Sequence, residues 1–270
     1  MATLDIDGHP TWFEDRPGPG GAPVVFLHGG LSNSDDMLES IGPTIGTTRR
    51  IVAFDRRGHG RTADTDEPFH YDSMASETIA VLEAVLGGPA HLIGWSDGGI
   101  VALLVALRRP DLIDRLVLIG TNYHFDGVVD LDIDPQSEFT TSLFTRYAER
   151  SPDGAEHFEV VADKAFTLFK TEPTLTTDDL ARITAPSLVL VGDDDLIAPA
   201  HTQSLFESLP NGQLCVIPGA SHAVPIEQPE RVARIVMGFL DYPVPPVTLV
   251  PNRRKAHADT SNRGSGSAAG

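Results

Sequence analysis

The sequence is poor in cysteine and in long apolar runs, and each shortage excludes a class of protein. The single cysteine, Cys215, cannot form an internal disulfide and fits a reduced, cytoplasmic setting. No apolar run reaches the roughly 18 residues that a membrane-spanning helix needs. The first residues, MATLDIDGHPTWFEDR, show no basic start followed by an apolar stretch, so no secretory signal is expected.

Positive charge is also scarce. The chain has 20 Lys and Arg against 38 Asp and Glu, for a formal net charge of -18. Such a chain is unsuited to bind nucleic acid or an anionic membrane. We interpret the acidity as a solvated surface, with adaptation to salt or attraction of a cationic substrate as alternatives. The 10 histidines are not clustered at metal-ligand spacing, so neither a metal site nor another cofactor is expected.

Apolar runs alternate with segments of helical periodicity along most of the chain. Strands are expected within 23–30, 50–60, 90–96, 113–121, 186–193 and 213–219, and helices at 71–88, 97–110, 200–210 and 226–240. The helix at 71–88 has Asp72 or Ser73 as its N-cap and Gly87 as its stop. Apolar strands that alternate with helices predict an α/β fold, with a mostly parallel sheet covered on both faces. The first residues could add an antiparallel hairpin at the sheet edge.

Two segments depart from this alternation. Residues 122–183 hold no convincing strand, and we expect a helical cap inserted into a core domain of residues 1–121 and 184–241. Aromatic residues recur in the cap, and we expect most of them to form its own core and one or two to face a substrate, among them Phe125, Phe139, Phe144, Tyr147, Phe158, Phe166 and Phe169. Residues 242–270 are rich in Pro, Ser, Gly and Ala and predict a disordered tail.

The motif GWSDGG places Ser96 between an expected strand and an expected helix. The pattern Gly94-x-Ser96-x-Gly98 at such a junction is typical of a nucleophile elbow, in which a strained turn lifts the serine hydroxyl above the sheet. Side chains two residues before or after the serine would collide with the neighbouring strand or helix, which accounts for the glycines. An N-cap role for Ser96 would explain the serine but not both glycines.

A serine hydroxyl needs a base, and the base needs an orienting carboxylate. His222 follows the last expected strand, and the chain order Ser, Asp, His favours it over the other histidines. Among the three acids of GDDD, Asp195 is the preferred orienting acid, because it lies past the turn at Gly192. Asp193 and Asp194 are interpreted as turn or surface residues.

Acyl transfer also needs two donors for the oxyanion. The backbone N–H of Asp97 directly follows the nucleophile, and the N–H of Gly30 lies in the loop after the first buried strand. Trp95 and the side chain of Asp97, which flank the serine, are the candidate substrate contacts. His28, beside this loop, is interpreted as a structural residue that ties the loop through hydrogen bonds.

Together these pieces resemble the α/β-hydrolase fold family. The matching segments, in order, are HGG (28–30), DRRGHGRT (55–62), GWSDGG (94–99), GDDDLIAP (192–199) and GASHAVPIEQPE (219–230). The resemblance implies hydrolysis without a cofactor, with Ser96 as nucleophile, Asp195 and His222 as its partners, and Gly30 with Asp97 as oxyanion donors. A serine at 96 argues against the haloalkane dehalogenase branch, where an aspartate stands.

GWSDGG also resembles the branch of this family with valacyclovir-hydrolase-like esterases, which accept amino-acid esters. A carboxylate beside the nucleophile opposes a developing oxyanion unless a cation compensates it, and a substrate amino group is one such cation. The alternative is that Asp97 turns away or meets an internal arginine: Arg56, Arg57 or Arg61.

The sequence therefore predicts a serine hydrolase that acts on a small-molecule ester or lactone through an acyl-enzyme. Amide hydrolysis, carbon–carbon bond hydrolysis and perhydrolysis are alternatives on the same fold. A non-catalytic receptor for a small molecule is a further alternative, which the intact Ser, Asp and His set disfavours.

Overall fold

A twisted sheet forms the centre of the computed structural model, which describes residues 2–129, 137–242 and 248–251. Its strands in the described part are β1 (Ala2–Ile6), β2 (His9–Arg16), β3 (Val24–Leu27), β4 (Ile51–Phe54), β5 (Ala90–Trp95), β6 (Ile113–Ile119), β7 (Ser187–Asp194) and β8 (Gly212–Ser221). They lie in the order β1-β2-β4-β3-β5-β6-β7-β8. β2 pairs antiparallel with β1 and β4, and the other pairs are parallel. The prediction of a mostly parallel sheet with a hairpin at its edge is confirmed.

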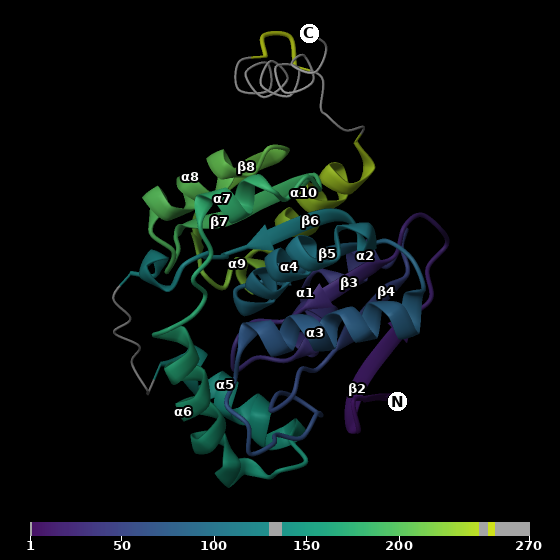
Figure 1. Cartoon of the computed structure of the whole chain (residues 1–270), viewed down its shortest axis with the longest axis vertical. Coiled ribbons are helices and arrows are strands. Elements are labelled where there is room, and N and C mark those ends of the chain that lie inside the picture. Colours follow the sequence, from purple (N-terminus) through teal and green to yellow (C-terminus); the bar gives the residue numbers. More distant parts are fainter. Residues whose placement is uncertain (1, 130–136, 243–247, 252–270) are drawn as a thin grey trace, which may run out of the picture.

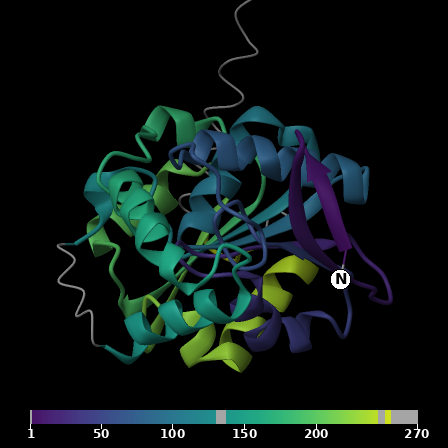
Figure 2. The same ribbon diagram turned by 90° about the horizontal axis from the view of Figure 1, so that it is seen from below.

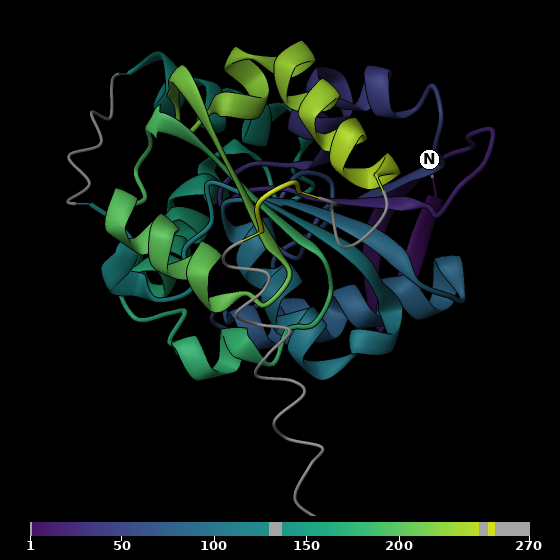
Figure 3. The same cartoon turned by 90° about the horizontal axis from the view of Figure 1, so that it is seen from above.

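Helices cover both faces of the sheet, as Figure 3 shows with α10 on one side and α3 and α4 on the other. The helices of the core are α1 (Ser34–Ser40), α2 (Gly42–Ile45), α3 (Tyr71–Val81), α4 (Asp97–Arg108), α8 (Pro199–Ser208), α9 (Val224–Glu227) and α10 (Pro229–Asp241). Successive residues of β5 alternate between the two apolar layers. Leu92 packs in the layer with α3 and α4, and Ile93 packs in the layer with α1 and α10. This alternation explains why the buried strands are apolar throughout.

Some boundaries differ from those expected. Helix α3 begins directly after His70, so neither Asp72 nor Ser73 is its N-cap, although the helical segment does end at Gly87 in a left-handed conformation. The closing helix is split into α9 and α10 at Gln228, because the following proline starts a new helical turn. Cys215 is only half-buried, since β8 is the last strand of the sheet.

The segment between β6 and β7 is mostly helical in its described part. It holds η3 (Phe125–Gly127), α5 (Glu138–Arg150), η4 (Ala155–His157), α6 (Phe158–Phe169) and α7 (Thr177–Ala181). Figures 1 and 2 show α5 and α6 beside one another at the same end of the molecule. Val161, Ala165 and Leu168 form the buried face of α6 and join the same apolar layer as α3 and α4. The cap is therefore packed onto the core through an amphipathic helix.

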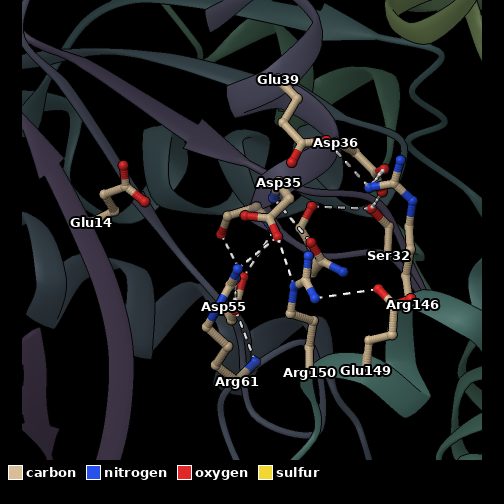
Figure 4. Close-up of polar contacts among 12 residues, drawn as sticks. Glu14, Ser32, Asp35, Asp36, Glu39, Asp55, Arg61, Arg146, Glu149 and Arg150 are labelled. Atoms are coloured by element: carbon tan, nitrogen blue, oxygen red, sulfur yellow. Dashed lines mark hydrogen bonds and ion pairs between the residues drawn. The ribbon is translucent and has the colours of Figure 1, made fainter. Parts of the chain in front are cut away.

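Ion pairs also dock the cap. Arg146 and Arg150 of α5 reach Asp36 and Asp35 in the first turn of α1, with N–O distances of 2.9 and 3.0 Å (Figure 4). Both aspartates are buried, so these pairs lie between cap and core rather than on an open surface. Because α1 starts a few residues after Gly30, the cap contacts the chain that carries a predicted oxyanion donor.

A second set of ion pairs joins η4 and the middle of α6 to the loop after β4. Asp64 accepts from Lys164 Nζ at 2.7 Å and from His157 Nε2 at 2.9 Å. Its own backbone N–H donates to the carboxylate of Asp153. Part of the acidity of this chain is thus used to hold basic residues of the cap.

Beyond α10 only short pieces of chain are described. Most of the predicted disordered tail, residues 243–247 and 252–270, lies outside the described residues, as does segment 130–136 of the cap. Among the residues that are described, no helix has both the length and the apolarity to cross a bilayer.

Candidate active site

Ser96 lies at the sharp turn from β5 to α4. Its backbone has φ 54 and ψ -119, a conformation that non-glycine residues rarely adopt. The turn is held on both sides, because Ser96 N–H donates to Ile119 O at 2.8 Å and Ser96 O accepts from Gly99 N–H at 2.9 Å. A strained serine fixed between a buried strand and a helix is the arrangement that the sequence predicted for this motif.

The two glycines of the motif are required by close backbone contacts. A Cβ at Gly94 would lie 2.3 Å from the carbonyl carbon of Gly98, at the start of α4. A Cβ at Gly98 would lie 1.9 Å from the carbonyl oxygen of Leu27, at the end of β3. Both distances are far below van der Waals contact. The glycine spacing therefore reflects the tight packing of β5, α4 and β3 around the serine.

Three predicted residues from distant parts of the chain meet at this turn. His222 Nε2 lies 3.0 Å from Ser96 Oγ, and His222 Nδ1 lies 2.8 Å from Asp195 Oδ1. Asp195 follows β7 and His222 follows β8, so both stand beyond the carboxyl ends of neighbouring parallel strands. The aspartate side chain is only 2% exposed. Its Oδ1 also accepts a hydrogen bond from Ile197 N–H at 3.0 Å, and this second bond restrains the orientation of the carboxylate.

The loop that carries His222 is held by several side chains. Glu227 accepts from Ser221 N–H at 2.8 Å, and Asp193 accepts from Gly219 N–H at 2.7 Å. Asp193 is thus a loop-holding residue rather than a partner of the imidazole. Sequence reasoning missed Glu227, whose role depends on a contact within the folded loop.

Trp95 also supports His222. Its indole N–H donates to the carbonyl oxygen of His222 at 2.9 Å, and the residue is only 2% exposed. The ring belongs to the apolar layer under α1 and α10. This burial argues against the predicted substrate contact at Trp95, because the side chain points into the core under the sheet.

Gly120, at the end of β6, is a further residue that the sequence analysis missed. Its φ is +54, and a Cβ there would lie 3.0 Å from His222 Nδ1 and 3.2 Å from Asp195 Oδ2. A side chain at this position would crowd the hydrogen bond between the imidazole and the carboxylate. A strand followed by an isolated glycine was the available signal.

The two predicted oxyanion donors lie next to each other. A Cβ at Gly30 would lie 2.6 Å from Asp97 Oδ2, so the loop after β3 touches the first residue of α4. Within the described chain, neither the Gly30 N–H nor the Asp97 N–H has a hydrogen-bond acceptor. Two unpaired N–H groups beside a serine hydroxyl are suited to bind an oxyanion.

The side chain of Asp97 is buried beside the serine. Its Oδ1 accepts from the Tyr71 hydroxyl at 2.8 Å, and the residue is 5% exposed. Burial raises the pKa of this carboxyl, and the charge of Arg56 together with the Tyr71 hydrogen bond opposes that rise. The sequence analysis offered an internal arginine as one possible partner of Asp97, and Arg56 is that arginine. Its positive charge acts on the carboxylate from a distance, because no nitrogen of Arg56 lies within 4.0 Å of an Asp97 oxygen.

Phe169 is the cap aromatic that the structure places at the site. A Cβ at Gly30 would lie 2.7 Å from Phe169 Cζ, so the ring at the end of α6 borders the loop with a predicted oxyanion donor. Phe166 packs edge-on against Phe169 with ring centroids 6.0 Å apart and is 39% exposed. An apolar wall from the cap thus borders the polar site of the core.

Among the described residues, no group of three His, Cys, Asp or Glu side chains is arranged to hold a metal ion.

The chain is a member of the alpha/beta hydrolase family, whose sequence profile matches residues 24–235. The match extends from β3 into α10 and so includes the serine turn, both partner loops and the cap. The resemblance inferred from the motifs is therefore confirmed.

Individual relatives agree with this assignment. RutD of Agrobacterium fabrum, described as a putative carbamate hydrolase, is 28% identical over 252 residues that cover 81% of this chain and 93% of that protein. Human serine hydrolase BPHL is 24% identical over 250 residues, which are 83% of this chain and 81% of that protein. The structure of Est816, described as an N-acyl homoserine lactone degrading enzyme, has a TM-score of 0.72 at 21% identity, covering 88% of this chain and 100% of that one. Both of these sequence relatives are described as hydrolases, and the likeness to Est816 shows the same fold.

Proposed function

We propose that this protein is a serine hydrolase that cleaves a small-molecule carboxylic ester or lactone through an acyl-enzyme. The observation that carries the proposal is the unbroken hydrogen-bonded series from Ser96 Oγ to His222 and on to Asp195, at 3.0 and 2.8 Å. The lactone-degrading activity named for Est816 supports including lactones among the substrates.

The first step is acylation of the serine. His222 Nε2 accepts the Ser96 hydroxyl proton while the oxygen attacks the substrate carbonyl, and the tetrahedral oxyanion accepts hydrogen bonds from the N–H groups of Gly30 and Asp97. The imidazolium is stabilised by Asp195. It then gives its proton to the leaving alkoxide as the carbon–oxygen bond breaks. The alcohol of an ester departs, whereas a lactone ring opens and keeps its new hydroxyl, and in both cases the acyl group stays on the serine.

The second step returns the enzyme to its starting state. His222, neutral again, accepts a proton from water as the water attacks the acyl-enzyme carbonyl. The same two N–H groups hold the second oxyanion. Collapse releases the carboxylic acid, and the serine oxygen recovers its proton from the imidazolium.

A fluorophosphonate probe tests the reactive serine directly. We expect stoichiometric labelling of Ser96, located by peptide mass spectrometry, and turnover of short p-nitrophenyl esters or lactones. If Ser96 is labelled but the protein cleaves only amides or only carbon–carbon bonds, Ser96 remains the nucleophile and the proposed ester or lactone reaction is wrong. Absence of both labelling and turnover in folded protein would favour a receptor and contradict the proposal.

An amino-acid ester is a narrower candidate substrate, favoured by the position of Asp97. Tyr71 occupies Oδ1 of this carboxylate, whereas Oδ2 faces Gly30 and has no hydrogen-bond donor within the described chain. A substrate ammonium group beside the scissile carbonyl could reach that oxygen. A buried carboxylate and an ammonium form a charge-assisted hydrogen bond, which is roughly twice as strong as a neutral one.

Asp97→Asn separates the two uses of this residue, since it keeps the backbone N–H and removes the charge. For an amino-acid p-nitrophenyl ester we expect kcat/KM to fall about 10-fold or more, in line with about 1.5–3 kcal/mol for a hydrogen bond to a charged group. The neutral ester of the same acid without the amino group should change about 3-fold or less. Equal losses for the two esters would exclude amino-group recognition by Asp97.

A further inference from the structure

The carbonyl of Gly29 is fixed from inside the protein. Arg56 Nη2 donates to Gly29 O at 3.1 Å, and His28 Nδ1 lies 2.7 Å from the same oxygen. In a trans peptide the C=O and the following N–H point in opposite directions. Holding the Gly29 carbonyl toward the interior therefore directs the Gly30 N–H the other way, into the site.

The hydrogen bonds of His28 define its protonation. Its Nε2 accepts from the backbone N–H of Arg56 at 3.1 Å, so its Nδ1 carries the proton and donates to Gly29 O. Burial, with the nearby Arg56 charge, holds the pKa of His28 well below its usual value. The same causes lower the pKa of His59 to about 3. Both imidazoles next to the guanidinium are thus neutral, and Arg56 is the cation of this group.

Arg56 is itself firmly placed. It is 1% exposed and follows Asp55, whose buried carboxylate accepts from Ser34 N–H at 2.8 Å and from Arg61 N–H at 2.9 Å. These bonds join the loop after β4 to the loop after β3. Nε and Nη1 of Arg56 are buried and have no hydrogen-bond partner in the described chain. Nη2 lies 3.2 Å from His28 Nδ1, but that nitrogen carries a proton and cannot accept, so Nη2 donates to Gly29 O.

The positive charge of Arg56 also affects Asp97, whose backbone N–H is the other predicted oxyanion donor. The Asp97 carboxylate has its Oδ2 against Gly30, where its negative charge would oppose an oxyanion. Arg56 and Asp97 lie against the same loop, Arg56 through Gly29 O and Asp97 through Gly30, and the positive charge of Arg56 opposes the rise that burial causes in the pKa of Asp97. An uncompensated buried charge at this position would be costly.

We propose that Arg56 is a positioning residue of the oxyanion hole: its guanidinium aims the Gly30 N–H by holding the Gly29 carbonyl and offsets the negative charge of Asp97. The inference rests on the proposed function, since it concerns the same acyl transfer. Arg56 does not touch the substrate, and it acts through the peptide and the carboxylate that do.

The test compares neighbouring arginines. Arg56→Met removes the charge and the donors with little change of shape, and Arg56→Lys keeps the charge with a single ammonium group. Arg57→Met is the matched control, because the Arg57 side chain pairs with Glu77 at 2.7 Å and forms no hydrogen bond or ion pair with the Gly29–Gly30 loop of the described chain. Each variant is measured with a neutral p-nitrophenyl ester, and thermal unfolding is recorded for each.

For Arg56→Met we expect kcat to fall about 10- to 100-fold, and KM to change by about 3-fold or less. This fall in kcat is somewhat smaller than the fall caused by removing an oxyanion donor altogether. Affinity for a trifluoromethyl ketone, which places an oxyanion in the hole, should fall in parallel. Affinity for the alcohol of the same carbon skeleton should stay unchanged. Arg56→Lys should show a smaller loss of both kcat and ketone affinity, and Arg57→Met should show neither.

The charge role has its own readout. Adding Asp97→Asn to Arg56→Met removes the uncompensated carboxylate, so the double variant should recover kcat at least about 5-fold over Arg56→Met. If Arg56→Met does not fold, Arg56→Lys measured with the ketone and the alcohol carries the test, since a loss of ketone affinity alone supports the positioning role. If Arg56 were only structural, Arg56→Met would lower the unfolding temperature, but the double variant would not recover kcat and ketone affinity would not be lost selectively.

Two results would overturn the inference: unchanged kcat and ketone affinity in folded Arg56 variants, or equal losses in Arg57→Met. Failure of the proposed function is a separate outcome. In that case the unmodified protein itself shows neither ester turnover nor labelling of Ser96 by the fluorophosphonate probe.

Discussion

Replacing Ser96 with alanine is expected to lower kcat for an ester by about 10⁴-fold or more, in line with losses of the nucleophile in other serine hydrolases. The variant lacks the oxygen that forms the acyl-enzyme, while His222, Asp195 and both N–H groups remain. Alanine has the same backbone restrictions as serine at φ 54, so the turn should keep its geometry and its strain. The measurement is initial rate on a p-nitrophenyl ester, with burst kinetics to follow acylation.

The matched control is Ser73→Ala, at an exposed position on α3 far along the chain from the turn. It should retain full activity and full labelling by the fluorophosphonate probe. Ser96→Ala should bind substrate with little change in Kd, because the hydroxyl contributes mainly to the reaction. Substantial turnover by purified, folded Ser96→Ala protein would contradict the assignment of the nucleophile.

The sequence predicted the serine turn well because its requirements are local. Gly94 and Gly98 are close to Ser96 in the chain, and the contacts that exclude a Cβ at each involve the strand and helix that flank them. The choice of His222 and Asp195 used chain order within a parallel sheet. That order brings the carboxyl ends of β7 and β8 beside β6, and so near the turn after β5.

The residues that the sequence did not reveal act across long separations. Tyr71 approaches Asp97 from α3, and no spacing rule connects these two positions. The sequence offered Arg56 only as one of three candidate arginines for Asp97, and the fold was needed to choose among them. The burial of Trp95 was also hidden from the sequence, and the predicted substrate contact there stays a prediction that this burial disfavours. A tryptophan beside a nucleophile suggests a substrate contact, but alternation along β5 turns its side chain to the opposite layer, under His222.

Asp195→Asn is expected to lower kcat about a thousandfold, approaching the loss for the equivalent change in a Ser-His-Asp triad. The structure makes the cause specific. Asp195 Oδ1 accepts from both His222 Nδ1–H and Ile197 N–H, so an asparagine should keep its carbonyl oxygen at that place. The imidazole then retains its orientation, and the loss reports the missing negative charge that stabilises the imidazolium in the transition state.

The neighbouring acids provide the controls. Asp194→Asn changes an exposed carboxylate and should leave kcat within about 2-fold, as is usual for surface substitutions. Asp193→Asn keeps the oxygen that accepts from Gly219 N–H, so it should also have little effect. A large loss in either control with normal activity in Asp195→Asn would move the orienting acid to that residue. Comparable activity in all three would mean that the imidazole at 222 works without a carboxylate partner, and the hydrogen bond at 2.8 Å would then be structural alone.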